Sequence, residues 1–153
     1  MSIISKVLSL ENPAFCGYVT YSSLLVLKMM IMPLLTVKQR RKFGVPISPE
    51  DCAIYNRKSL RLHEEVERIR RAHLNDLENI PIFFIAGAFY LLTNPSPRTA
   101  LNLFRTYTIA RYCHTFVYAV VVIPQPARAI SWSIGFAITG YMLFRTIRHF
   151  KAF

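Results

Sequence analysis

Four long apolar stretches alternate with polar segments along the chain, at about residues 13–37, 76–94, 99–123 and 127–148. About 20 apolar residues suffice for a helix to cross a bilayer, so the pattern predicts four membrane spans. The short segments 94–97 (Asn-Pro-Ser-Pro) and 124–126 (Pro-Gln-Pro) are typical of tight turns. We therefore expect an all-α membrane protein, a four-transmembrane-helix bundle in which residues 1–153 form a single domain.

The polar segment at residues 38–65 is much longer than the two turns and strongly basic. Ten of the nineteen Lys and Arg residues of the chain lie between Lys38 and Arg71. Because basic residues concentrate in cytoplasmic loops, we expect this loop to face the cytoplasm and both termini to be lumenal. The basic segment 145–151 favours the opposite orientation, but the loop region carries more charge and outweighs it.

Two helix starts are visible within this loop. Residues 48–51 (Ser-Pro-Glu-Asp) combine a capping serine, a proline at the first position and two acids at the positive end of the helix dipole. The short helix expected here would present Asp51 and Cys52 beside the membrane surface. Neighbouring cations favour a thiolate there, so we expect Cys52 to be the most reactive of the three cysteines. The central helix is expected to begin near Glu64.

Composition and charge exclude several classes of protein. With 53% hydrophobic residues and a mean hydropathy of +0.31, the chain is too apolar for an ordinary soluble domain. The net charge of +11 could indicate nucleic-acid binding. However, the basic residues alternate with apolar spans instead of lining one soluble face, so we predict no nucleic-acid partner. The three scattered cysteines lack the paired spacing of a disulfide framework or a zinc site, and we predict no metal.

Polar side chains inside the predicted spans are expected to face other helices. Lys28 lies near the middle of the first span, where a charge is unfavourable in lipid, so we expect it to be buried with Asp76 as its partner. Arg105 lies off the polar face of the third span and is interpreted as structural. That face must meet other helices or a water-filled cavity, and it carries Tyr107, Thr108, Arg111, His114, Thr115 and Tyr118.

Charged residues also gather where the later spans approach the cytoplasmic side. One narrow arc of the central helix carries Glu67, Arg71, Asn75 and Glu78. This spacing fits a polar-ligand site at the membrane surface and a solvated helix end with ion pairs equally well. Arg71, Arg111 and Arg128 outnumber the acids near them, so they predict an anionic ligand. A zwitterionic peptide with two carboxylates and a lipid headgroup both meet this requirement.

The segment at residues 66–79, Val-Glu-Arg-Ile-Arg-Arg-Ala-His-Leu-Asn-Asp-Leu-Glu-Asn, resembles the signature of the microsomal glutathione transferases in the MAPEG superfamily. Shorter matches occur in the family's order at 49–52 (Pro-Glu-Asp-Cys), within 110–118 (Ala-Arg, His-Thr and Tyr) and at 124–129 (Pro-Gln-Pro-Ala-Arg-Ala). The resemblance covers essentially the whole chain. It implies a homotrimer in the endoplasmic reticulum membrane, with the mitochondrial outer membrane as a second location. Glutathione would be bound between neighbouring subunits near the cytoplasmic face.

The resemblance also implies which residues hold glutathione and which one acts on its sulfur. Arg128 matches the arginine that stabilises the glutathione thiolate, a role in which an adjacent cation lowers the thiol pKa from about 8.5. Asp51 either orients Arg128 or only caps its own helix, and His114 either shapes the pocket or is structural. His73 lies on the side of its helix away from Arg71, so its assignment rests on the resemblance alone. The implied glutathione contacts are Arg40, Arg70, Arg71, His73, Asn75, Glu78, Arg111 and Tyr118.

The activity implied is conjugation of the glutathione thiolate to lipophilic electrophiles, with glutathione peroxidase activity on lipid hydroperoxides. Glutathione is then a cosubstrate, and the expected partners are further copies of the chain, glutathione, the lipophilic substrates and membrane lipids. Two alternatives within the superfamily are a prostaglandin E synthase-like isomerase and a non-catalytic lipid-binding adaptor. Synthase-like members carry arginine at the position of Leu74 and serine at that of Ala129. The complete set of arginine, asparagine and glutamate residues disfavours the adaptor.

Overall fold

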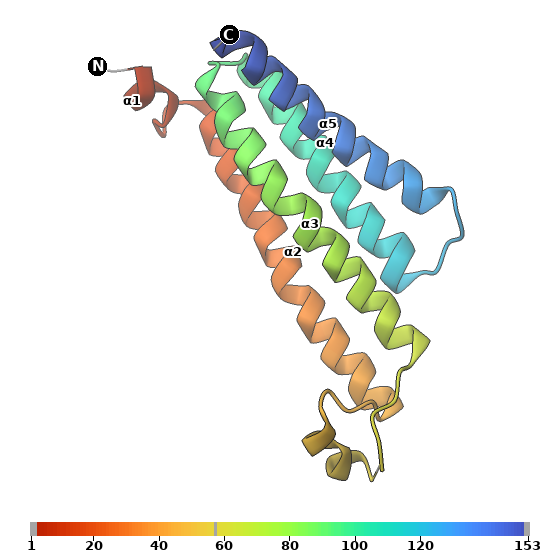
Figure 1. The fold of residues 1–153 in the computed structure, drawn as a ribbon. Coiled ribbons are helices and arrows are strands. Elements are labelled where there is room, and N and C mark those ends of the chain that lie inside the picture. The colour runs from red at the N-terminus through yellow and green to blue at the C-terminus, as the bar shows by residue number, and fades with distance from the viewer. Residues whose placement is uncertain (1–2, 57, 152–153) are drawn as a thin grey trace.

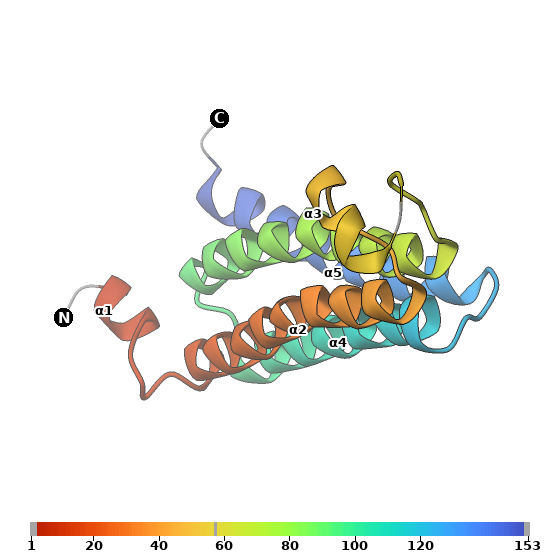
Figure 2. The ribbon, with the colours of Figure 1, turned by 90° about the horizontal axis from the view of Figure 1, so that it is seen from below.

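Four long helices dominate the computed structural model, which describes residues 3–56 and 58–151 and contains no strand within them. The helices are α2 (Pro13–Phe43), α3 (Glu64–Leu92), α4 (Pro97–Thr115) and α5 (Ala127–Phe150). They run alternately up and down, and α2 and α5 each pack against both α3 and α4 (Figures 1 and 2). The all-helical prediction is confirmed.

One long helix meets the requirements for crossing a membrane by length and composition alone. This helix is α2, and no other helix among the described residues satisfies the same criterion. Helices α3 and α4 carry charged residues within their length, such as Asp76 and Arg111, whereas the charged residues of α5 lie near its two ends. The prediction of four membrane spans therefore stays a prediction.

The two ends of the bundle differ in what they carry. At one end lie the short helix α1 (Ile3–Val7), the turn between α3 and α4, and the last turns of α5 (Figure 1). We call this the terminal end. At the other, the loop end, lie the 3₁₀-helix η1 (Pro49–Tyr55), the single-turn π-helix η2 (Phe116–Val120) and the loop that leads into α5 (Figure 1).

Helix α2 begins where the sequence predicts but continues past the predicted end at residue 37. Asn12 caps its start, because the side-chain oxygen accepts a hydrogen bond from the backbone N–H of Ala14 at 3.0 Å. The helix ends only at Phe43, before Gly44, whose left-handed backbone (φ 60°) is typical of a helix C-terminus. The end of an apolar run indicates where a bilayer could end, whereas the helix continues through the basic residues that follow.

Helix α4 stops short of the predicted boundary at residue 123. It ends at Thr115, and the chain widens into the π-turn of η2 before the loop to α5. Tyr118 lies within this turn. Single π-turns next to α-helices are frequent at functional sites, so the turn is a reason to examine the surroundings of Tyr118.

The apolar core lies between the four long helices. The ring of Phe83 in α3 stacks on that of Tyr107 in α4, with centroids 3.8 Å apart. Gly135 of α5 faces this pair, since an added Cβ would lie 3.3 Å from the Tyr107 ring, and Ser131 one turn earlier is also buried. These small residues let α5 approach α4 closely. Other fully buried members of the core are Leu25, Ile80, Phe104, Leu91 and Met142.

The predicted short helix at residues 48–51 is present as η1, but its cysteine does not face solvent. The hydroxyl of Ser48 donates to the carboxylate of Asp51 at 2.9 Å. Cys52 is buried, with 7% of its surface exposed, whereas Cys113 is exposed. The expected accessibility of the Cys52 thiol is wrong because η1 turns this side chain inward.

Candidate functional site

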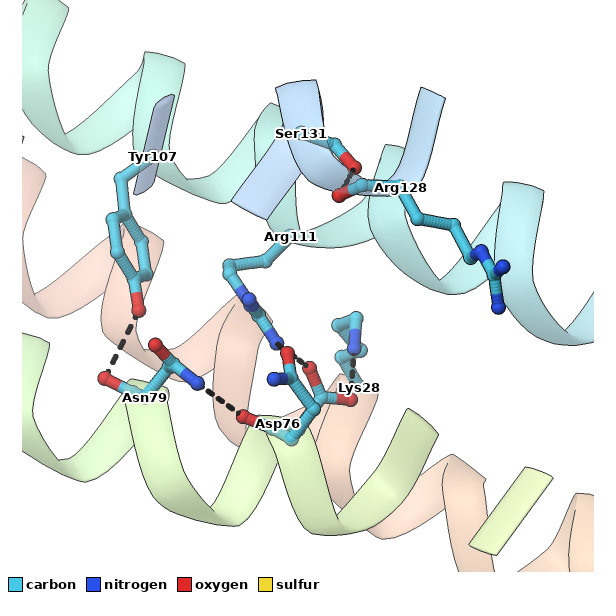
Figure 3. A network of polar contacts seen from close by, with 8 residues as sticks. Lys28, Asp76, Asn79, Tyr107, Arg111, Arg128 and Ser131 are labelled. Carbon is cyan, nitrogen blue, oxygen red and sulfur yellow. Dashed lines mark hydrogen bonds and ion pairs between the residues drawn. The ribbon is translucent and has the colours of Figure 1, made fainter. Parts of the chain in front are cut away.

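A buried ion-pair network joins three of the long helices. Lys28 of α2 donates to one carboxylate oxygen of Asp76 of α3, as the sequence predicts. Arg111 of α4 donates from Nη2 to the other oxygen of Asp76 at 2.6 Å, and also to Oδ1 of Asn75 at 2.8 Å (Figure 3). The side chains of Lys28, Asp76 and Arg111 are at most 4% exposed. One buried carboxylate thus serves two cations, and this network holds one excess positive charge.

The apolar periodicity of the helices explains why these charges meet. Asp76 lies on the buried stripe of α3, at helical spacing from Ala72 and Ile80. Arg111 lies on the polar face predicted for the third span, and the structure buries that face except for Tyr118, which is half-buried. The pairing of Arg111 with Asp76 was not predicted from the sequence. The sequence nevertheless contains the information that could have indicated this pair, because both charged residues lie on helix faces that must point into the bundle.

A second cluster brings two arginines from different helices to one tyrosine. Arg71 of α3 donates from Nε to the hydroxyl of Tyr118 at 3.3 Å. The guanidinium of Arg128 in α5 lies over the face of the same ring, 4.7 Å from its centroid, in a cation–π contact. The ring of His114 lies 5.6 Å from that of Tyr118. Residues far apart in the sequence therefore converge at the loop end of the bundle.

Several buried polar atoms around these two clusters have no hydrogen-bond partner in the described part of the chain. They are Nε of Arg111, Nε of Arg128, Nδ1 of His114 and the hydroxyl of Thr115. Buried donors without partners are unfavourable and rare in native proteins. Arg71 also stays charged, because hydrogen bonds to Tyr118 and to Glu64 raise its pKa, and it forms an ion pair with Glu64 at 2.5 Å. The unpaired donors, the one excess cation of the Asp76 network and Arg128, which has no ion pair in the described chain, together favour an anionic ligand.

A cavity of about 530 Å³ lies between α3 and α5. Its α3 wall is mostly polar and includes Asn75 and Glu78, and no ion pair of Glu78 occurs within residues 3–56 and 58–151. Its α5 wall is apolar and includes Trp132 and Phe136, whose rings stack with centroids 5.0 Å apart. These two aromatic residues were not singled out from the sequence. The sequence feature that could have indicated them is an aromatic pair at i, i+4 spacing, which begins one helical turn after Arg128.

Three of the predicted contacts lie outside both clusters and do not line the cavity. Arg40 donates to the backbone oxygen of Pro46 at 3.0 Å, and Arg70 pairs with Glu67 at 2.8 Å. His73 is half-buried, and its side chain has no hydrogen bond to another residue that the structure describes. The assignment of all eight residues as glutathione contacts stays a prediction.

Asp51 was predicted either to orient Arg128 or to cap its own helix. It accepts a hydrogen bond from Ser48, and it has no contact with Arg128 within the described chain. Arg105, interpreted as structural, donates to the hydroxyl of Tyr21 at 2.9 Å.

Comparison with known proteins gives one consistent relationship. The MAPEG family model matches residues 18–148. Microsomal glutathione S-transferase 1 of Homo sapiens is 38% identical over 144 residues, which cover 91% of this chain and 92% of that protein. The protein of the same name from Rattus norvegicus is 39% identical over the same shares. Prostaglandin E synthase of Homo sapiens is 30% identical over 129 residues, 84% of each chain.

Proposed function

Because the chain belongs to the MAPEG family, we propose that it is a membrane-bound glutathione transferase. The relatives named microsomal glutathione S-transferase 1 match it with higher identity and coverage than those named prostaglandin E synthase. Leu74 and Ala129 support the same branch, since they replace the arginine and serine of the synthase-like members. The proposed reaction joins the glutathione sulfur to a lipophilic electrophile.

The observation that carries this proposal is the convergence of Arg71 and Arg128 on Tyr118, beside a buried network with excess positive charge. Arg71 would hold a carboxylate of glutathione, as guanidinium groups suit bidentate contacts with carboxylates. On the cavity wall, Glu78 would bind the ammonium group and Asn75 an amide of the peptide. Arg111 fixes Oδ1 of Asn75, which leaves the NH₂ group of this side chain free to donate to the ligand.

In the proposed mechanism, Arg128 holds the glutathione sulfur as a thiolate. An adjacent guanidinium lowers the thiol pKa and increases the thiolate fraction at neutral pH. The thiolate then attacks an electrophile that enters from the bilayer along the apolar wall at Trp132 and Phe136. With a lipid hydroperoxide, the thiolate attacks the peroxide oxygen and releases the alcohol. A second glutathione then converts the resulting sulfenic acid to glutathione disulfide and water.

We propose further that the protein is a homotrimer, that each chain has four membrane spans, and that the loop at 38–65 faces the cytoplasm. The proposed location is the endoplasmic reticulum membrane, with the mitochondrial outer membrane as a second location. The apolar length of α2 and the word microsomal in the names of the relatives support a membrane location. Many large apolar side chains on the outside of the bundle are exposed, among them Leu34, Ile82 and Phe136. Surfaces of this kind meet lipid or partner subunits.

Purified, detergent-solubilised protein would test the proposed function directly. We expect equilibrium binding of glutathione, conjugation to a chloronitrobenzene electrophile, and reduction of a lipid hydroperoxide. Binding without either reaction would favour the adaptor, and conversion of a prostaglandin endoperoxide without conjugation would favour the isomerase. Absence of glutathione binding by the folded protein would exclude every proposed function that depends on glutathione.

Arg71→Ala is expected to weaken glutathione binding by about 1.5–3 kcal/mol, the usual scale for a hydrogen bond to a charged group. Isothermal titration of the solubilised protein measures this change. Arg68→Ala is the matched control, because Arg68 lies on the same helix and pairs with Glu65 at 3.4 Å, outside both clusters. Equal affinity in wild type and Arg71→Ala would remove Arg71 from the site.

Tyr118→Phe separates the two contacts of this side chain. The phenylalanine ring can still lie under Arg128, but it offers no hydroxyl to Arg71. We therefore expect KM for glutathione to rise several-fold, while kcat stays within about twofold because the sulfur-binding arginine keeps its support. Steady-state kinetics with glutathione as the varied substrate give both constants. A large fall in kcat at unchanged KM would instead assign the tyrosine hydroxyl to the chemical step.

A further inference from the structure

A second polar pocket lies at the terminal end of the bundle. It has a volume of about 260 Å³ and is lined by Thr93, just after α3, and by Arg145, Arg148 and His149 in the last turns of α5. Arg145 follows Arg128 by 17 residues on the same helix, about 26 Å along its axis at 1.5 Å per residue. The pocket is therefore separate from the cluster at Tyr118.

The cations of this pocket have no acidic partner in the chain as described. Neither Arg145 nor Arg148 forms an ion pair with any residue in 3–56 or 58–151, and no acidic residue follows Glu78 in the sequence. The guanidinium of Arg148 lies over the ring of Phe144, 5.7 Å from its centroid. This contact leaves its N–H groups free at the edge.

Arginines near the C-terminus of a helix also stabilise the helix dipole, and that role alone could explain one of them. Stabilisation of the helix dipole does not explain why two arginines and a histidine line the same pocket. The hydroxyl of Thr93 already donates to the backbone oxygen of Tyr90 at 2.7 Å, so the pocket's free donors come from its basic side chains. Guanidinium groups match the planar, multidentate geometry of phosphate oxygens.

We propose that Arg145, Arg148 and His149 bind the phosphate group of an anionic phospholipid. The same part of α5 indicates a lipid rather than free phosphate. Phe144, Ile147 and Phe150 lie three residues apart on one face and are 56%, 56% and 54% exposed, as an acyl chain beside the phosphate requires. A bound anionic headgroup would also neutralise positive charge of the basic segment 145–151. The charge of this segment favours the membrane orientation opposite to the one predicted from the basic loop at 38–65. The proposal rests on the membrane location within the proposed function.

Lipid titration of the full chain tests this site. Wild type in phosphatidylcholine nanodiscs is titrated with fluorescent phosphatidylglycerol, and the double variant Arg145→Gln/Arg148→Gln is compared with it. The control is Arg98→Gln/Lys151→Gln, which removes the same charge at exposed positions that do not line the pocket. We expect at least a tenfold loss of phosphatidylglycerol affinity in the pocket variant and less than a twofold loss in the control.

Three outcomes would overturn the proposal. The first is unchanged lipid affinity in a pocket variant whose unfolding midpoint equals that of wild type. The second is an equal loss in the control, which would assign the effect to overall charge. The third is displacement of the lipid by inorganic phosphate at equal concentration, which would identify a free-anion site. Conjugation measured on the same samples keeps the two proposals separate, since normal turnover in the pocket variant leaves the proposed function intact whatever the lipid result.

Discussion

Arg128→Ala is expected to slow glutathione conjugation by about 10²–10³-fold, the usual effect of removing one group that stabilises a developing anion. Glutathione affinity should change by less than about threefold, because the peptide's carboxylates supply most of the binding and are held by other arginines. The guanidinium of Arg128 is placed for this role by its contact with the ring of Tyr118, and its Nε has no hydrogen-bond partner in the described chain.

Two readouts separate chemistry from binding in this variant. The ultraviolet absorbance of the thiolate reports the ionised sulfur of bound glutathione, and we expect it to fall sharply while total binding persists. Arg128→Lys should restore part of the signal, because it keeps a cation near the sulfur. Arg105→Ala is the control, since Arg105 is exposed on α4 and contacts Tyr21 instead. If Arg128→Ala forms thiolate and conjugates substrate like wild type, Arg128 is a charge at a helix end and Tyr118 becomes the next candidate.

Asp76→Asn is expected to lower the free energy of unfolding by about 3–5 kcal/mol, because it leaves both Lys28 and Arg111 buried without a counterion. Lys28→Met should be clearly milder. From the sequence alone, losing Lys28 would strand Asp76, but the structure shows that Asp76 keeps its ion pair with Arg111. Adding Asp76→Leu to Lys28→Met should then recover little stability, since Arg111 would lose its only acidic partner in the described chain.

Unfolding of the solubilised variants, followed by helix content against denaturant, measures this order. The mild effect of Lys28→Met is the informative part, as it depends on the second cation at Asp76. If Lys28→Met and Asp76→Asn destabilise the protein equally, the contact between Arg111 and Asp76 contributes nothing to stability. The network would then reduce to the single pair that the sequence predicts.

Periodicity predicted the parts of the molecule that depend on one helix at a time. The polar face of the third span contains Thr108, Arg111 and His114, and the structure buries all three. The pairing of Lys28 with Asp76 was also predictable, because a mid-span cation must find one of the few acids. The start of α3 at Glu64 and of α5 at Ala127 followed from acids and turn residues next to the apolar runs.

Features that depend on how helices rotate against one another could not be predicted in the same way. Predicting the ion pair between Arg111 and Asp76 requires knowing how far α3 and α4 are shifted along their axes relative to each other, and no local sequence pattern gives this shift. The inward direction of Cys52 depends on how η1 folds back, and exposure was therefore assigned wrongly from its place in a polar loop. The π-turn at η2 likewise has no periodic signal, yet it sets the position of Tyr118.

Tyr118 couples Arg71 to Arg128 because both arginines contact its side chain. Arg71 and Arg128 come from different helices and contact the hydroxyl and the ring face of the same side chain, so removing Tyr118 disturbs both. Effects of residues with a common partner are not additive. The losses measured for single variants at positions 71, 118 and 128 will therefore sum to something other than the loss in the triple variant. Only double-mutant cycles through position 118 can apportion binding and turnover between the two arginines.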